Sequence, residues 1–340
     1  EHMKLVKNST FVGLLTALFS TILGLFVAIS VWVAGNKAGK ILESILLISM
    51  VSPPFVSSLA YIQLFGRNGL ITKRVLGLSI NPYGWVGVVV MQTMFFASLN
   101  ALMIIGMLRK VDMSLVSASA DLGAGSGYTL WRIVVPLLRP ILLSCFLLSF
   151  IRSVSDYGTP VVIGGRFETV STEIYMQVIG YSRLDKSAAL NVLILIPAIL
   201  VFAAYRYLMK KNERLISGNS NKTMESGDSY RVKGLSAIVV WLGAAIFYVM
   251  MALVYGSIFL NSFTKNMRGK LKFTTEYLDA LLERNMDTFI RSVEYALIVA
   301  VIGSLIGILL SYYIDRRKIR FGGLLDFIIT MPYILPGSCF

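Results

Sequence analysis

The side chains that usually carry catalysis or bind metals are sparse in this sequence and do not cluster. The single histidine, His2, stands near the start of the chain, and the two cysteines, Cys145 and Cys339, lie far apart. Two such cysteines support neither a disulfide framework nor a zinc site. A phosphate-binding loop needs Gly-x4-Gly-Lys-Ser/Thr, and the nearest stretch, 35–41, has another spacing and no hydroxyl. We therefore expect no catalytic residue, no metal site and no cofactor bound by this chain.

Polar and helix-breaking residues inside apolar stretches are better candidates for function. Arg152 and Asp156 stand four apart and can pair on a helix, and ionisable groups in a membrane span usually face a cavity or a partner. Gln92 and Asn100 stand eight apart, roughly on one helix face. Broken helices often line transport pathways. As path-lining candidates we take Pro53, Pro54, Gln92, Asn100, Arg152, Asp156 and Tyr157.

Each of these candidates has a plainer structural alternative. The Arg152–Asp156 pair fits the outer membrane surface equally, and the prolines fit kinks that only improve packing. Gln92 and Asn100 also suit hydrogen bonds that hold neighbouring helices together. Gly24 and Gly307 are small positions that favour helix packing rather than transport.

Composition identifies the elements that must carry these residues as membrane-spanning helices. The chain has 340 residues, 56% hydrophobic and 15% charged, with a mean hydropathy of +0.73, whereas soluble domains carry about 25% charged residues. A helix needs about 20 apolar residues to cross a hydrocarbon core of about 30 Å, and it satisfies its own backbone in lipid. We expect an all-α polytopic protein with about eight spans: 11–35, 44–66, 84–108, 136–156, 187–205, 236–260, 295–314 and 324–340.

Basic residues at the span ends explain the formal charge of +14 and predict the topology. Nucleic-acid binding is disfavoured because these residues sit where membrane orientation is set. If the spans alternate, the densest basic loops share one side, which is then cytoplasmic, although the opposite loops 67–74 and 265–272 are also basic. This orientation places the N-terminus outside. The cytoplasmic loops are 37–40, 109–110, 210–233 and 316–320.

A parallel repeat divides the chain into two membrane halves. The segment 9–53 can be laid over 292–336 without a gap, and eight of the 45 positions are then identical, including Pro53 and Pro336. Repeated halves are common in transporters. We interpret 1–209 as a first half that lacks its first span, 210–233 as a polar cytoplasmic linker, and 234–340 as the start of a second half. We therefore expect the chain to be the middle of a longer protein.

A short segment composed mostly of small residues, 117–124, follows the third predicted span. Small side chains make a thin helix that fits deep in a partner's groove, and Gly123 permits a terminal turn with positive φ. Pro136 then restarts a helix that enters the membrane. Such a rigid, exposed helix suits the transmission of force from a soluble motor.

At this point the sequence resembles the inner-membrane permeases of binding-protein-dependent ABC importers. Their signature has Glu-Ala-Ala, then Gly, Ile and Pro at set spacings; here Ser117 replaces the Glu and Ser119 replaces the last Ala. The resemblance implies the type I ABC importer transmembrane fold and a coupling loop, 114–140, that docks on an ATPase subunit. The coupling residues it implies are Ser117, Ala118, Ser119, Asp121, Leu122, Gly123, Ala124, Ile133 and Pro136.

Further segments resemble ferric-iron-type permeases and their relatives for thiamine and aminoethylphosphonate. They are 52–55, 155–160, 163–165 and 171–175. The resemblance implies import of a small solute, with ferric iron first and thiamine, aminoethylphosphonate or a polyamine as alternatives. An ion-coupled secondary transporter and a membrane enzyme are alternatives of other classes, both disfavoured by the scarcity of buried acids and bases.

The resemblance also implies partners and a location. Two ATPase subunits carry ATP and Mg²⁺ on the inner side of a bacterial inner membrane. A periplasmic binding protein docks on the outer loops 67–83, 157–186 and 261–290. We expect lipid around the multi-pass chain and no nucleic acid.

Overall fold

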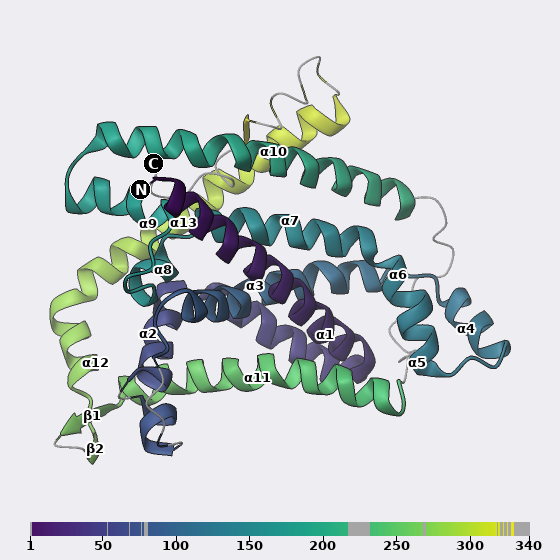
Figure 1. Cartoon of the computed structure of the whole chain (residues 1–340), viewed down its shortest axis with the longest axis horizontal. Helices are drawn as coiled ribbons and strands as arrows, with labels where there is room; N and C mark the ends of the chain where they lie inside the picture. The colour runs from purple at the N-terminus through teal and green to yellow at the C-terminus, as the bar shows by residue number, and fades with distance from the viewer. Residues whose placement is uncertain are drawn as a thin grey trace. The chain divides into compact units, whose positions relative to one another are not determined.

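A computed structural model describes residues 2–52, 54–67, 69–75, 77, 81–216, 232–267 and 270–317, and the single positions 319, 322, 325, 328 and 329. Over these residues the secondary structure is helical apart from one hairpin. The chain forms two compact units, Glu1–Tyr255 and Gly256–Tyr333. Figure 1 shows the helices of both units, and each unit is described by itself below.

Seven of the eight predicted spans correspond to helices of the structure, and the eighth, 324–340, lies almost wholly outside the described residues. Among the described residues, five helices are long and apolar enough to cross a membrane, or up to seven if each bent helix pair counts as one span. The spanning helices and the elements next to them are α1 (His2–Val51), α2 (Pro54–Phe65), η1 (Leu70–Val75), α3 (Trp85–Leu108), α7 (Arg139–Ser155), α10 (Leu184–Ile216), α11 (Leu235–Ser262), α13 (Met286–Ser311) and η5 (Tyr312–Arg316).

Short helices connect these spans. On one side of unit 1 they are α4 (Met113–Asp121), α5 (Ser126–Thr129), the π-helical turn η2 (Leu130–Val134) and α6 (Val135–Leu137). On the other side they are α8 (Gly158–Ile163), α9 (Val170–Tyr175) and η3 (Met176–Gly180). Figure 1 shows α4 and α5 at one end of this unit, and the N-terminus, α8 and α9 at the other.

The predicted loop 37–40 is helical in the structure, and the break in α1 comes two residues earlier, at Gly35. Gly35 has φ 77° and ψ 179°, which a residue with a side chain rarely adopts, so the chain turns back there and a second helical arm follows. A Cβ at Gly39 would lie 2.8 Å from the carbonyl oxygen of Val31. The two arms of α1 therefore approach so closely that only glycine fits at position 39.

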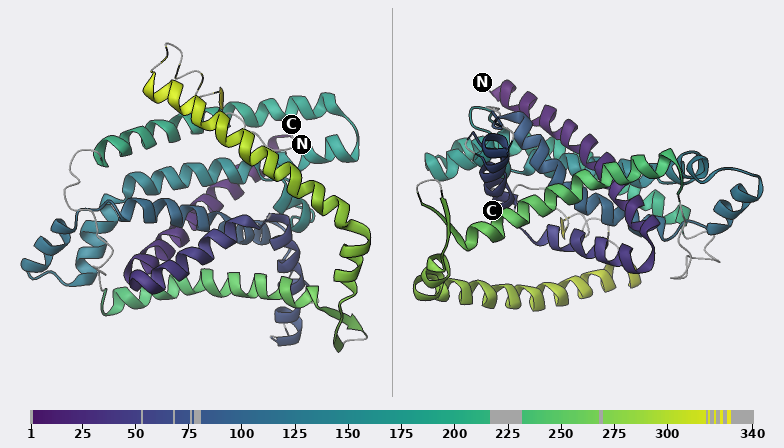
Figure 2. Two further views of the ribbon diagram at one scale, coloured as in Figure 1. Left: turned by 180° about the vertical axis from the view of Figure 1, so that it is seen from behind. Right: turned by 90° about the horizontal axis from the view of Figure 1, so that it is seen from below.

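The core of unit 1 lies between α1, α3 and α7, and the first half of α11 packs against it. A Cβ at Gly24 in α1 would lie 2.8 Å from Cβ of Asn100 in α3, so these two helices are in backbone-close contact. α11 contributes Val240, Ala244 and Phe247 to the same buried cluster. On another side α10 runs along α7, with Phe202 and Ala198 buried against Ile151 (Figures 1 and 2).

The repeated segments share local geometry. The ungapped alignment of the two halves pairs Met3, at the start of α1, with Met286, at the start of α13. The same alignment pairs Val31 with Ile314 and Gly39 with Gly322. A Cβ placed at Gly322 would lie 3.8 Å from Cγ2 of Ile314. A Cβ at Gly39 would likewise lie 3.8 Å from Cγ1 of Val31, so the aligned positions share this aliphatic contact, although the 2.8 Å approach to a backbone oxygen is found at Gly39 and not at Gly322.

Two sequence expectations differ from the structure. α10 continues through residues 210–216, so the start of the predicted linker is helical, because Lys, Glu and Arg in this stretch are good helix formers. The rest of the linker, 217–231, lies outside the described residues. Gly307 was expected to make a packing contact like Gly24, yet no atom lies within 4 Å of a Cβ placed there.

The outer segment of unit 2 contains a hairpin that the sequence did not predict. β1 (Thr264–Met267) pairs antiparallel with β2 (Lys270–Phe273), so that Lys265 faces Lys272. Two short turns, α12 (Glu276–Ala280) and η4 (Leu281–Asn285), then lead into α13.

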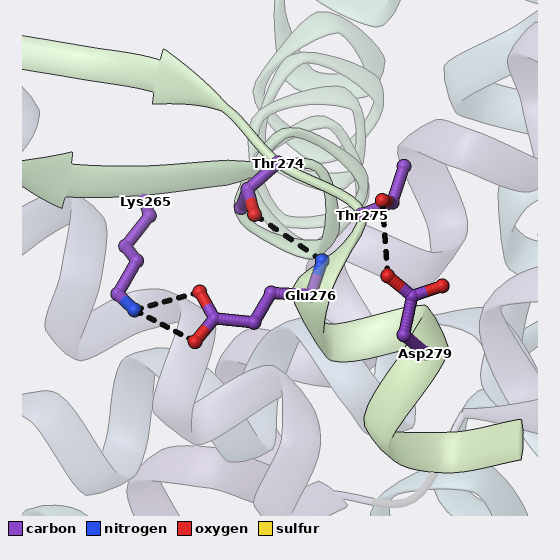
Figure 3. A network of polar contacts seen from close by, with 5 residues as sticks. All are labelled: Lys265, Thr274, Thr275, Glu276 and Asp279. Carbon is purple, nitrogen blue, oxygen red and sulfur yellow. Dashed lines mark hydrogen bonds and ion pairs between the residues drawn. The ribbon is translucent and has the colours of Figure 1, made fainter. Parts of the chain in front are cut away.

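Lys265 relieves this like-charge pairing by binding Glu276. Its Nζ donates to both carboxylate oxygens at 3.0 and 2.7 Å (Figure 3). This contact raises the pKa of the Lys265 ammonium, through the hydrogen bond first and the opposite charge second. Exposed ion pairs of this kind contribute little to stability. We therefore interpret the contact as one that fixes the orientation of β1 relative to the start of α12.

Substitution of Gly24 tests the α1–α3 contact. We predict that Gly24→Ala destabilises the protein by about 1–3 kcal/mol, because the added methyl must push α1 away from α3. Gly106→Ala on the exposed face of α3 meets no atom within 4 Å and should stabilise by about 0.5–1 kcal/mol through helix propensity. Thermal unfolding in one detergent measures both; equal midpoints for the two variants would contradict the packing account.

Candidate functional site

The predicted coupling loop, called the coupling segment below and taken here as residues 112–140, contains a short helix, α4, that is capped at both ends. The Asp112 side chain accepts a hydrogen bond from the Ser114 amide at 2.9 Å, as an N-cap residue does. At the other end the Ala124 amide donates to the Ser119 carbonyl at 3.0 Å, and the Gly123 amide donates to the Ala120 carbonyl at 2.9 Å. This pair of bonds is a Schellman motif.

Gly123 occupies the left-handed position that the motif requires, with φ 82°. The sequence prediction of a positive-φ turn at this glycine is therefore confirmed. No atom lies within 4 Å of a Cβ placed there, so backbone conformation, rather than space, selects glycine.

The predicted coupling residues divide into an exposed face and an anchoring face. Ser117, Ala118 and Asp121 are exposed on α4, and Leu122 is 89% exposed. Ser119 is buried, and Ala124, Ile133 and Pro136 are half-buried. The arrangement presents small and polar side chains on a rigid helix, with one leucine at its tip.

Ser119, one of the two departures from the family signature, has a specific partner. Its hydroxyl hydrogen-bonds that of Thr129 over 2.8 Å, and both residues are buried. Thr129 Oγ1 also bonds the Gly125 carbonyl at 3.3 Å. A buried hydroxyl without a partner costs stability, so the Ser119–Thr129 pair shows how α4 is held on α5 despite the loss of an alanine.

The end of the inter-half linker docks on the same segment, which the sequence did not reveal. The Lys233 amide donates to Ser126 Oγ at 3.0 Å, and Val232 is buried in the core of unit 1. A Cβ at Gly127 would lie 2.3 Å from Ser236 Oγ at the start of α11. Because the two partners are far apart in the sequence, no local sequence pattern predicts the contact.

The coupling segment joins the membrane through a bent connection. The helical stretch Ser126–Leu137 meets Arg139–Ser155 at 61°. Leu130, Val134 and Leu138 are fully buried in the core cluster. The part of the segment from Leu130 to Leu138 is therefore packed into the core of unit 1, whereas α4 projects away from that core.

The two amide side chains proposed for the path lie in helix contacts. Gln92 is 1% exposed; its Oε1 accepts from Thr16 Oγ1 at 3.1 Å and from Ser153 Oγ at 2.6 Å. Asn100, fully buried, donates through Nδ2 to Ser20 Oγ at 3.2 Å and to Ser149 Oγ at 2.9 Å.

Each amide thus bridges one hydroxyl of α1 and one of α7, and these polar bridges, called here the amide ladder, cross-link three helices. Its spacing explains the pattern in the sequence. The two hydroxyl residues are four positions apart in α1 and also in α7, and the two amide residues are eight positions apart in α3. This geometry supports the helix-joining alternative; the path role of Gln92 and Asn100 stays a prediction.

The other path candidates lie near the ends of these helices. Asp156 ends α7, and its Oδ1 accepts from the Gly158 and Thr159 amides at 3.0 and 3.3 Å. Its Oδ2 accepts from Gln92 Nε2 at 2.9 Å. Tyr157 stacks on Tyr175 with ring centroids 5.0 Å apart.

The remaining three candidates are less informative. Arg152 is half-buried in the last turn of α7. Pro53 lies outside the described residues, and Pro54 begins α2. Within the described part of the chain, no group of three His, Cys, Asp or Glu side chains has metal-binding geometry.

Comparison with known proteins gives one family and several relatives. The family described as "Binding-protein-dependent transport system inner membrane component" matches residues 20–214. "Ferric transport system permease protein FbpB" of Actinobacillus pleuropneumoniae is 29% identical over 99% of this chain and 50% of that protein. A putative FbpB 1 of Haemophilus influenzae is 29% identical over 99% of this chain and 54% of that protein. The chain thus spans about half the length of these relatives.

Two further comparisons cover less of the chain. "Molybdenum transport system permease protein ModB" of Mycobacterium tuberculosis is 31% identical over 57% of this chain and 76% of that protein. An inward-facing structure of the MetNI methionine ABC transporter aligns with 63% of this chain and 94% of that chain, at 16% identity and a TM-score of 0.46.

Gly127 offers a test of the linker contact. We predict that Gly127→Val displaces Ser236 and breaks the Lys233–Ser126 bond, so that amides 232–237 exchange with deuterium at least tenfold faster. Gly125→Val is the matched control, because a Cβ at Gly125 meets nothing within 4 Å. Unchanged protection in the Gly127 variant would show that the linker end is not held there.

Proposed function

We propose a function from one premise: the chain belongs to the family of binding-protein-dependent transport system inner membrane components. As a member of this family it is a transmembrane permease component of the inner membrane and not a catalytic subunit. We propose that it forms part of the translocation unit of an ATP-binding-cassette importer, with ATP and Mg²⁺ held by separate ATPase subunits.

The observation that carries this proposal is the exposed helix α4. It is capped at both ends, anchored through Ser119, and projects its small residues away from the core of unit 1. An ATPase subunit with a groove for a thin helix fits this face. The leucine at the tip, Leu122, supplies an apolar contact that would be buried on docking.

We further propose that force enters the membrane by two routes from α4. One route is covalent and passes through η2 and α6 into α7. The other passes from Ser126 and Gly127 to the start of α11, the first helix after the linker. Closure of the ATPase subunits would move α4, and both helices would move with it.

The permease halves and partners complete the proposal. Residues 1–209 act as one half with its coupling loop, and the second half begins at about residue 234. Two ATPase subunits dock on the inner side, and a periplasmic binding protein delivers the solute to the outer loops. The repeated glycine contact at Gly39 and Gly322 supports the assignment of halves.

Ferric iron is the cargo we propose. It is favoured by the FbpB relatives, which match nearly the whole chain and carry ferric transport in their names. The ModB relative named for molybdenum matches a shorter part. Thiamine, aminoethylphosphonate and a polyamine are the alternative cargoes, and solute binding by the partner binding protein separates them.

A secondary transporter is the alternative from another class. It would need a titratable group deep in a span, and Asp156 is the nearest candidate because Gln92 binds it at the end of α7. Uptake that persists in vesicles without ATP, driven only by an ion gradient, would favour this alternative.

Substitution of Gly123 tests the coupling role. We predict that Gly123→Val abolishes co-purification with the ATPase subunits, because a β-branched residue at φ 82° costs roughly 1–2 kcal/mol and reshapes the end of α4. Gly123→Asn should retain binding, since asparagine tolerates the left-handed region. Full ATPase binding and solute-stimulated ATP hydrolysis in the valine variant would count against the proposed function.

A further inference from the structure

A cavity of about 720 Å³ opens at the end of unit 1 opposite α4. Its walls come from the start of α1, the turn after α2, the approach to α3 and the connection between α8 and α9. Aromatic walls are formed by Tyr83, Trp85 and Phe167, and basic side chains by Lys4, Arg67 and Arg166.

The frame of the cavity is held by specific hydrogen bonds. Asn8 Nδ2 donates to the Glu168 carbonyl at 2.9 Å and ties α1 to the α8–α9 connection. The Gly84 amide donates to the Ile163 carbonyl at 3.0 Å and ties the approach to α3 to the end of α8. Gly84 and Gly165 adopt φ of 98° and 59°, which lets the backbone turn tightly at the rim.

The charge of this cavity has one sign. Lys4, Arg67 and Arg166 come from three separate segments, and no Asp or Glu is among the described residues that line the cavity. Glu168, two residues after Arg166, is among the residues that line a different cavity. Three cations gathered around one opening raise the local concentration of anionic groups and guide their approach.

We propose that this cavity receives acidic side chains of the periplasmic binding protein. The inference rests on the proposed function and assigns the docking residues on the outer face. A protein partner fits better than a free anion, because the cavity is several times larger than a phosphate group needs. Arg, Tyr and Trp are also the residues that dominate protein–protein hot spots.

The chemistry of the partner follows from the lining. Carboxylates on a binding-protein loop would pair with the guanidinium groups of Arg67 and Arg166, which offer two parallel donors each. The aromatic walls would bury the apolar part of the same loop. Pairing at the outer end would hold the release site of the binding protein over the helices that α4 moves.

The test is a binding measurement with charge reversal. The permease, assembled with its ATPase subunits in nanodiscs, is titrated with the binding protein encoded with it. Arg67→Glu and Arg166→Glu should each raise Kd at least tenfold and flatten its rise between 50 and 200 mM NaCl. Lys7→Glu changes an exposed lysine of α1 that neither lines the cavity nor belongs to a predicted docking loop, and it should change Kd less than threefold.

Fold and occupant are checked in the same samples. Unchanged ATPase co-purification and thermal midpoint show that a variant is folded. Equal binding by wild type and both cavity variants overturns the cavity assignment while the proposed function stands. Failure of the wild type to bind the binding protein at all overturns the proposed function as well.

Two probes test whether the cavity binds a free anion or a lipid headgroup instead of the carboxylates of the binding protein. Inorganic phosphate, or vesicles containing phosphatidylglycerol, is offered to the wild type and to Arg166→Glu. Loss of phosphate or vesicle binding in the variant, with binding-protein affinity unchanged, assigns the cavity to a free anion or a lipid and overturns the proposal. Competition of the binding protein by its own acidic-loop peptide supports it.

Discussion

The hydrocarbon core of a membrane offers no partner to a buried polar group, and this constraint governs how unit 1 is built. Its interior nevertheless contains amides and hydroxyls, and the amide ladder pairs them between α1, α3 and α7. Gln92 and Asn100 each bridge two helices, while Gly24 lets α1 approach α3 closely enough for these bonds. Interhelical hydrogen bonds of this kind contribute about 0.6–2 kcal/mol each in membranes. These hydrogen bonds connect the three helices into one packed frame.

That frame positions two different surfaces at its two ends. At one end α4 projects from a bent, buried base, and hydrogen bonds cap both of its termini. At the other end Asn8 and Gly84 hold the loops that shape the basic cavity. In the proposed function, a displacement at α4 would reach the loops at the other end through side chains that are already packed in the core of unit 1.

Much of this arrangement was predictable, and the remainder depends on contacts distant in sequence. Hydropathy located the spans because lipid imposes their length, and the requirement for positive φ identified Gly123 as a helix end. The partners of Gln92 and Asn100 were left open because their hydroxyls stand in other helices, far away along the chain. The docking of Lys233 on Ser126 was missed for the same reason, because the two residues belong to distant segments. The β1–β2 hairpin is local, but its strands of four residues each are too short to give a clear alternating pattern. Of the three basic residues of the cavity, only Arg67 lies in a loop that was noted as an exception to the charge rule for topology, and the sequence does not show that it converges with Lys4 and Arg166.

The side of the membrane on which α4 lies is the most direct test. A variant with Cys145 and Cys339 replaced by alanine and Leu122 by cysteine carries one thiol, at a position of the predicted coupling loop where the native side chain is 89% exposed. A membrane-impermeant maleimide should label this thiol in inside-out vesicles and not in intact spheroplasts, and bound ATPase subunits should protect it. Labelling from the outside, or equal labelling with and without the ATPase, would contradict the account.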